Sequence, residues 1–275
     1  MGTDQYIDNV IKRDLVITAF IQSVVDRALA YLECGSSICL VGPAGVGKTS
    51  LAMLIASKLK RPIVFIEGDE SFGSPDLIGG YHGYTVKKVV DNYISSVLKT
   101  VEEVWENWVD SRLTTACKEG YTLIYDEFNR SRPEANNVLL TALEEKILAL
   151  PPLLGSRSLV RVHPDFRCIL TCNPKEYAGV FQTPDALKDR TVFINLTRFD
   201  RETEVAIVEK RAGISQEQAR TVVEAVDGLR AMTGKRISVR VCILLGRLVA
   251  AGHLKIPFKG DLWQEVVRDL TGNSV

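Results

Sequence analysis

Short apolar runs recur along the chain and are separated by longer segments with a different periodicity. Each run is five to eight residues long, the usual length of a strand that is buried on both faces. The runs lie at residues 37–41, 62–66, 122–127, 166–173 and 191–196. Strands that alternate with helical segments in this way predict an α/β fold.

The segments between the runs have other patterns. Apolar residues three and four positions apart predict helices at residues 14–33, over about 51–59, at 89–118 and throughout 200–275. Residues 67–88 are rich in glycine and acidic residues, which predicts a loop over the edge of the sheet. Residues 146–165 alternate short apolar pieces with proline and glycine, and they predict a β-hairpin insertion of about this extent.

The loop after the first run has the sequence of a phosphate-binding P-loop. Residues 42–49 fit G-x-x-x-x-G-K-[ST], and the flanking strand and helix supply the context that this short motif requires. Lys48 would reach the β- and γ-phosphates of ATP, and the Thr49 hydroxyl would bind Mg²⁺. The residues expected to hold the nucleotide are Gly42, Pro43, Ala44, Gly45, Val46, Gly47, Lys48, Thr49 and Ser50.

Two acidic residues end the third apolar run, at the rim where ligands bind in open α/β sheets. Asp126 would hold Mg²⁺ through water, and Glu127 would polarise the attacking water as a general base. A solvated acidic turn is the alternative interpretation, against which the P-loop argues. Ser131 and Glu134 have the spacing of a capping box, which predicts that a helix with Pro133 in its first turn begins here.

Composition excludes several classes of function. The 34 basic residues balance 34 acidic residues, so the chain lacks the basic excess of a dedicated nucleic-acid binder. No stretch of 18 apolar residues predicts a membrane span, and the first residues do not resemble a secretion signal, so a cytoplasmic location is expected. The six cysteines form no C-x-x-C pair, which favours reduced, mostly buried thiols over a zinc site or a disulfide framework.

Taken together, the five strands, the P-loop, the acidic strand end and an amide at the tip of the fourth strand resemble the AAA+ ATPases. Residues 126–145 (DEFNRSRPEANNVLLTALEE), 171–174 (TCNP) and 185–190 (DALKDR) are similar to the MoxR-type branch. Residues 68–99 resemble the GvpN family of gas vesicle proteins within that branch. The resemblance extends from about residue 14 to residue 250.

This resemblance implies a fold and further site residues. The fold would be a five-stranded parallel sheet flanked by helices, in a nucleotide-binding domain of residues 1–199, followed by a small helical lid at residues 200–275. Asn173 matches the sensor 1 residue that helps to position the hydrolytic water, and Arg240 matches sensor 2 on a lid helix. Arg190 matches the arginine finger, which acts on ATP bound to a neighbouring subunit and is worth about 10³–10⁵ in rate.

Some alternatives remain open for these arginines and for the function. Arg130 and Arg132 are rival fingers because both closely follow the acidic pair, and any single arginine can instead form a surface ion pair. We expect an ATPase that uses ATP and Mg²⁺ and couples hydrolysis to gas vesicle formation. Its active sites would be shared between the subunits of a ring, which the resemblance implies is a hexamer.

The expected partners are further copies of the chain and the shell and accessory proteins of gas vesicles, not nucleic acid or a membrane. One alternative is a MoxR-type activator or metal-insertion chaperone of another enzyme, against which residues 68–99 argue. A second alternative is a non-hydrolysing, ATP-gated structural component, which would need neither Glu127 nor Arg190. A small-molecule kinase fits poorly, because the chain has no evident acceptor site.

Overall fold

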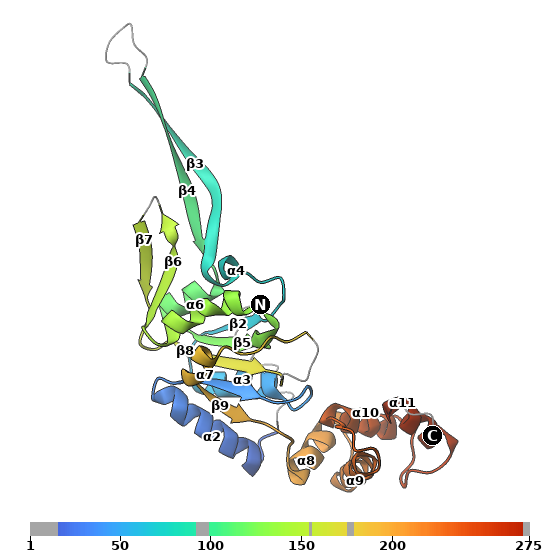
Figure 1. Ribbon diagram of the computed structural model, residues 1–275. Coiled ribbons are helices and arrows are strands. Elements are labelled where there is room, and N and C mark those ends of the chain that lie inside the picture. Colours follow the sequence, from blue (N-terminus) through green and yellow to red (C-terminus); the bar gives the residue numbers. More distant parts are fainter. Residues whose placement is uncertain (1–15, 92–98, 154–155, 175–178, 272–275) are drawn as a thin grey trace.

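The computed structural model describes residues 16–91, 99–153, 156–174 and 179–271. Its centre is a parallel sheet of five strands in the spatial order β2-β5-β8-β1-β9, which confirms the predicted α/β architecture (Figure 1). The strands are β1 (Ser37–Val41), β2 (Ile63–Glu67), β5 (Thr122–Asp126), β8 (Arg167–Cys172) and β9 (Thr191–Asn195). Because all five strands run in the same direction, the segments that follow them meet at one edge of the sheet.

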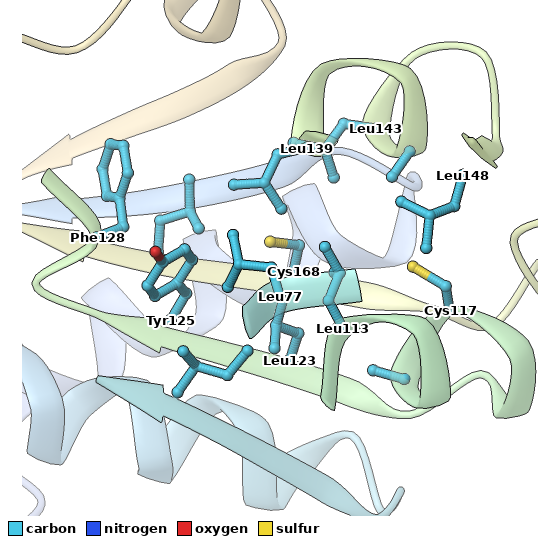
Figure 2. Packing of buried hydrophobic residues seen from close by; sticks show 14 of the residues in the cluster. Leu77, Leu113, Cys117, Leu123, Tyr125, Phe128, Leu139, Leu143, Leu148 and Cys168 are labelled. Carbon is cyan, nitrogen blue, oxygen red and sulfur yellow. The ribbon is translucent and has the colours of Figure 1, made fainter. Parts of the chain in front are cut away.

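Helices cover both faces of this sheet, which is why its strands are almost continuously apolar. Successive strand residues face opposite sides, so Ile38 and Ile169 pack with α2 (Ala19–Glu33) and α3 (Lys48–Lys58). The opposite face packs against α4 (Ser74–Ile78), α5 (Arg112–Glu119) and α6 (Pro133–Leu143). Figure 2 shows this second core, in which Leu77, Leu113 and Leu139 point toward Leu123 and Tyr125 of β5.

The first helix begins later than predicted. The apolar pattern predicted a helix from residue 14, whereas α2 begins at Ala19, and residues 14 and 15 lie outside the described part of the chain. Thr18 has extended backbone angles, and its hydroxyl accepts a hydrogen bond from the Ile21 amide at 3.4 Å. Thr18 therefore caps the helix, and Ile17, which is 54% exposed, lies outside the core.

The predictions of a loop at 67–88 and a helix at 89–118 were wrong for most of the described residues. Of the predicted helix, residues 112–118 are helical in α5, and residues 92–98 lie outside the described part of the chain. The region instead contains α4, a long antiparallel hairpin of β3 (Gly79–Asp91) and β4 (Lys99–Asp110), and α5. Residues 101–108 have apolar positions at helical spacing, but the backbone register pairs Val86 with Val104 and Lys88 with Glu102. Backbone pairing with a second strand overrides the helical spacing, and the pattern of one strand alone cannot reveal such pairing. Figure 1 shows the hairpin extending away from the sheet.

A second antiparallel hairpin lies in the region where the sequence predicted one. Strands β6 (Ile147–Leu153) and β7 (Ser156–Arg161) pair with each other alone. The β6–β7 hairpin lies on the same side of the sheet as the β3–β4 hairpin (Figure 1). A short helix α7 (Asp185–Asp189) then leads into β9, and the 3-10 helix η1 (Phe128–Arg130) follows β5.

Helix α6 contains Pro133 in its first turn, as predicted, but the expected capping box is absent. The residue before the helix is Arg132, which makes no side-chain capping bond. The Ser131 hydroxyl instead accepts hydrogen bonds from the Tyr125 hydroxyl at 2.7 Å and from the Asp69 amide at 3.0 Å. Ser131 thus joins β5 to the segment after β2.

The C-terminal region is helical, as the pattern predicted. It consists of α8 (Arg201–Ala212), α9 (Gln216–Thr233), α10 (Val239–Ala250) and α11 (Asp261–Thr271). These helices share a hydrophobic cluster of their own, centred on Val208, Val222 and Leu245. Figure 1 shows them beyond the end of the sheet, opposite the β3–β4 hairpin. Within the described residues, none of the helices is long and apolar enough to cross a membrane.

Candidate functional site

The P-loop connects β1 to α3 at the carboxyl edge of the sheet. Gly45 and Gly47 have φ angles of 85° and 78°, in the left-handed region that side chains disfavour. Among the described residues, the backbone amides of residues 44–48 have no hydrogen-bond acceptor. A run of free amides at a helix N-terminus is the arrangement that binds phosphate.

Lys48 lies under this loop and is almost completely buried, with 6% of its surface exposed. Its ammonium group donates to the carbonyl oxygens of Gly42 at 2.8 Å and Pro43 at 3.0 Å, and to Asn173 Oδ1 at 2.8 Å. Burial lowers the pKa of Lys48 below its usual value, although the Glu127 and Asp126 carboxylates oppose this shift. The predicted residues Lys48 and Asn173, 125 positions apart, are therefore in direct contact.

Asp126 lies at the end of β5 and accepts hydrogen bonds from two hydroxyl groups. Thr49 Oγ1 lies 2.9 and 2.8 Å from its two carboxylate oxygens, and Thr171 Oγ1 donates to Oδ1 at 2.6 Å. Thr171 in turn accepts a hydrogen bond from the Glu127 amide at 2.9 Å. Thr171 was not among the site residues predicted from the sequence, although two-residue alternation along β8 places it on the same side as Asn173.

Glu127 has backbone angles of φ 48° and ψ 40°, a left-handed conformation that is unusual for a residue other than glycine. Its Oε1 accepts a hydrogen bond from Asn173 Nδ2 at 3.3 Å, and its Oε2 accepts one from Arg130 Nη1 at 3.1 Å. Asn173 therefore bridges Lys48 and Glu127. Strained backbone is typical of functional sites, where surrounding contacts hold it in place.

Asn129 is a second site residue that was not predicted from the sequence. Its side chain donates to the Asn173 carbonyl at 2.8 Å and accepts a hydrogen bond from the Asn173 amide at 3.3 Å. This pair of contacts fixes the backbone of Asn173. The available signal was the position of Asn129, three residues after the acidic strand end, on the same rim.

The predicted arginines occupy different surroundings. Arg240 lies at the start of α10, near the P-loop, because a Cβ added to Gly45 would lie 3.7 Å from Arg240 Cδ. Arg190 follows α7, forms an ion pair with Glu144, and donates to the Ala186 carbonyl at 2.6 Å. Arg130 contacts Glu127, whereas Arg132 is exposed at the start of α6. Arg130 and Arg240 thus lie near the P-loop and the acidic pair of the same chain, whereas the contacts of Arg190 lie with α6 and α7.

Two hollows flank the P-loop. One, of about 270 Å³, lies between Ser50 and the apolar side chains of Val16, Ile207 and Ile243. The other, of about 520 Å³, lies between residues 41–46 and a part of the C-terminal helical region that includes Glu204 and Arg230. Arg211 and Arg240 also line the first hollow, so it offers polar and apolar contacts to a group attached to phosphates bound at the loop.

The oxygen donors at the site suit Mg²⁺. Thr49 and Asp126 supply a hydroxyl and a carboxylate that already lie within 3 Å of each other at the N-terminus of α3. Mg²⁺ prefers such hard oxygen ligands and usually combines one or two carboxylates with water and substrate phosphates. Thr49, Asp126 and the free amides therefore form a set of groups that fits a magnesium nucleotide.

Comparison with known proteins agrees with this geometry. Residues 37–191, from β1 to the first residue of β9, match the family described as AAA domain (dynein-related subfamily). The RuvB Holliday junction branch migration motor of Thermotoga maritima has a similar fold, with a TM-score of 0.53 over 94% of this chain and 72% of that protein. At 16% sequence identity, that likeness concerns the fold alone.

Curated relatives are more similar in sequence. The gas vesicle ATPase GvpN of Ancylobacter aquaticus is 41% identical over 243 residues, which cover 88% of this chain and 68% of the relative. The GvpN of Haloferax mediterranei is 41% identical over 85% of this chain and 67% of its own length. The protein CbbQ of Hydrogenophilus thermoluteolus is 24% identical over 78% of this chain and 74% of its own length.

Proposed function

The chain belongs to the GvpN family of gas vesicle ATPases within the AAA domain proteins, and from this premise we propose that it couples ATP hydrolysis to gas vesicle formation in the cytoplasm. As a member of this family it is a nucleotide-binding ATP hydrolase. The identity of 41% to the GvpN relatives, against 24% to CbbQ, supports vesicle formation over activation of another enzyme.

The proposed nucleotide site assigns one task to each part of the loop. The amides of residues 44–48 and the Lys48 ammonium bind the phosphates, and residues 42–50 enclose them. The adenine base of ATP lies in the hollow of about 270 Å³ beside Ser50, against Val16, Ile207 and Ile243. Thr49 and Asp126 hold Mg²⁺, which neutralises charge on the transferring phosphoryl group when it is bound.

The single observation that carries hydrolysis, rather than mere binding, is the hydrogen-bonded chain from Lys48 through Asn173 to Glu127. In the proposed mechanism Glu127 is the general base that accepts a proton from the attacking water, and Asn173 orients that water and the carboxylate. Because the Asn173 side-chain amide contacts both residues, the phosphate-binding Lys48 and the proposed general base Glu127 lie on opposite sides of it. A protein that only senses ATP would need no base in this position.

The site is proposed to be completed by a neighbouring subunit. Arg190 contacts Glu144 and Ala186 on the surface of its own chain, so as a finger it would reach ATP bound to the next copy. Arg240 would contact the phosphates in the same chain, above Gly45. The assembly is proposed to be a ring, which the family resemblance implies is a hexamer, with residues 1–199 of each subunit as the nucleotide-binding domain and residues 200–275 as the lid.

The proposed partners are the shell and accessory proteins of gas vesicles. The β3–β4 and β6–β7 hairpins both extend on the side of the sheet opposite the C-terminal helices (Figure 1). They therefore offer surfaces that the nucleotide does not occupy.

The experiment replaces Glu127 by Gln in the chromosomal copy of a vesicle-forming host and examines the cells by electron microscopy. The change keeps the shape of the side chain and removes the base, so ATP binding survives while hydrolysis stops. Stunted or missing vesicles are expected. Glu67→Gln, at an exposed acidic residue at the end of the adjacent strand β2, is the control and should leave vesicles normal.

Normal vesicles in a Glu127→Gln host, with hydrolysis shown to be absent in the purified variant, would overturn the proposal. If Lys48→Ala then still abolished vesicles, the chain would act as an ATP-gated structural component. Copurification of a metabolic enzyme, instead of vesicle proteins, would indicate an activator of the CbbQ kind.

A further inference from the structure

A network of four charged side chains joins the C-terminal helices behind the P-loop. At its centre is Glu204 of α8, which is 1% exposed. Arg198 donates to its two oxygens at 3.1 and 2.9 Å, and Arg230 donates to the same two oxygens at 3.0 and 2.9 Å. Asp227 accepts a bond from each arginine, at 2.5 and 2.7 Å, so two positive charges meet two negative charges.

One end of this network holds the segment that leads to Arg240. The Nε and Nη2 atoms of Arg230 both donate to the Ile237 carbonyl, at 2.9 and 2.7 Å. Ser238, the next residue, approaches the P-loop so closely that a Cβ added to Gly45 would lie 2.7 Å from Ser238 Cβ. Arg230 therefore fixes the backbone that sets the start of α10, where Arg240 is the second residue.

The other end of the network is tied to the core of the sheet. Arg198 lies in the connection between β9 and α8, two residues after Leu196. The Leu196 amide donates to the Val41 carbonyl at 2.7 Å, directly before the P-loop begins. Glu204 thus links residues 196–198, which are anchored beside the start of the P-loop, to residues 237–238, which lie over Gly45 in the middle of the P-loop.

Glu204 and Arg230 are the more buried members of the network, whereas the Arg198 and Asp227 side chains are 43% and 33% exposed. Burying an ion pair is a poor way to gain stability, because well-packed apolar residues of similar volume are often at least as stabilising. Paired guanidinium and carboxylate groups do, however, impose fixed directions and distances. The hollow of about 520 Å³ beside the network also leaves this part of the molecule less densely packed than a core. These features favour a role for the network in fixing the positions of the segments that it joins, more than a role in stability.

We infer that Glu204 is a positioning residue for nucleotide binding. Through Arg230 and the Ile237 carbonyl, it sets the place of Arg240 over the P-loop. Arg198 connects the same carboxylate to the strand end beside the loop, so the lid and the loop keep one relative position. This inference rests on the proposed contact of Arg240 with ATP.

The test is a double-mutant cycle that measures the affinity for the slowly hydrolysed analogue ATPγS, with Mg²⁺, by calorimetry. Glu204→Gln and Arg240→Ala are each expected to weaken binding about tenfold, a usual size for a coupling between sites. If Glu204 acts only through Arg240, the double variant binds no more weakly than Arg240→Ala alone. Independent effects would instead multiply to about a hundredfold.

Two further variants separate positioning from folding. Arg230→Lys keeps the charge beside Glu204 but loses the planar fork that reaches Ile237, so it should reproduce the weakened binding and the same non-additivity. If Glu204→Gln does not fold, Arg230→Lys carries the cycle in its place. Glu224→Gln removes the exposed ion pair with Arg201 between the same two helices, and should leave affinity unchanged.

The results distinguish this inference from the proposed function. Suppose that Arg240→Ala alone weakens ATPγS binding, and that the effects of Glu204→Gln and Arg240→Ala on affinity multiply in folded variants. This result would overturn the positioning role and leave the ATPase assignment intact. Unchanged affinity in Arg240→Ala would refute the contact of Arg240 and the inference together. None of these measurements depends on vesicles, so normal vesicle formation in a Glu127→Gln host would not affect them.

Discussion

A methyl group placed on Gly68 should slow hydrolysis without touching the nucleotide. Gly68 is buried after β2, and a Cβ built on it would lie 2.2 Å from the Glu127 carbonyl oxygen and 2.9 Å from its carbonyl carbon. Real Cβ atoms do not approach other atoms within 3.0 Å, so Gly68→Ala must move residue 68 and the Glu127 backbone apart by about 0.8 Å, the difference between 3.0 and 2.2 Å. A misplacement of about 1 Å can cost about 10² in rate.

We therefore expect kcat to fall about a hundredfold, which corresponds to about 2.7 kcal/mol of transition-state stabilisation. The affinity for ATP should remain within about threefold, because the P-loop amides and Lys48 are not displaced. Phosphate release under single-turnover conditions measures the first quantity, and calorimetric titration measures the second. The Gly68 amide, which donates to the Asp126 carbonyl at 2.7 Å, remains in the variant.

Gly73→Ala is the matched control. It lies on the same connection, at the start of α4, and an added Cβ there would meet its nearest atom, Pro75 Cδ, at an ordinary 3.4 Å. Its turnover should equal that of the unmodified protein. The reasoning would be refuted if folded Gly68→Ala hydrolysed ATP at the normal rate, because the close approach would then not determine the position of Glu127.

Three further predictions follow from the contacts. Purified Arg190→Ala and Glu127→Gln, each inactive alone, should regain ATPase activity when mixed, because a shared site can combine an intact base with an intact finger; no recovery in mixed assemblies would argue against a finger in trans. Tyr125→Phe removes a hydroxyl that donates at 2.7 Å in the core and should lower the free energy of unfolding by about 1 kcal/mol in urea titration, and an unchanged midpoint would contradict this. Iodoacetamide at pH 8 should label exposed Cys34 and spare Cys117, because burial raises the pKa of Cys117 to about 12 and keeps the thiol protonated; mass spectrometry of digested protein would reveal labelling at Cys117 as the opposite result.

Local sequence patterns predicted the sheet and much of the proposed site. Each apolar run is a strand: β1, β5 and β8 are buried on both faces, and β2 and β9 at the sheet edges are partly buried, so composition alone distinguishes the runs from their surroundings. The carboxyl ends of parallel strands meet at one edge, which is why Lys48, Asp126 and Asn173 were expected together. Lys48 contacts Asn173, and Asp126 contacts Thr49, the residue after Lys48. Their chemical roles remain predictions.

The parts that the sequence did not predict depend on contacts between distant segments. Residues 101–108 have the spacing of a helix, but β3 offers them a complementary strand, and tertiary pairing outweighs a local pattern. Ser131 has the spacing of a helix cap, yet Tyr125 and Asp69 compete for its hydroxyl. Thr171 was missed because its importance arises only when β8 lies beside β5.

Strand β9 has a consequence for cooperativity. It is five residues long, begins directly after Arg190 and ends just before Leu196, which is bonded to the start of the P-loop region. Throughout its length it pairs with β1, the strand that carries the P-loop. An arginine that senses the nucleotide of a neighbour would thus share one rigid strand pair with its own phosphate site. Adjacent sites in a ring would then not hydrolyse ATP independently, and the dependence of the ATPase rate on ATP concentration would be sigmoidal.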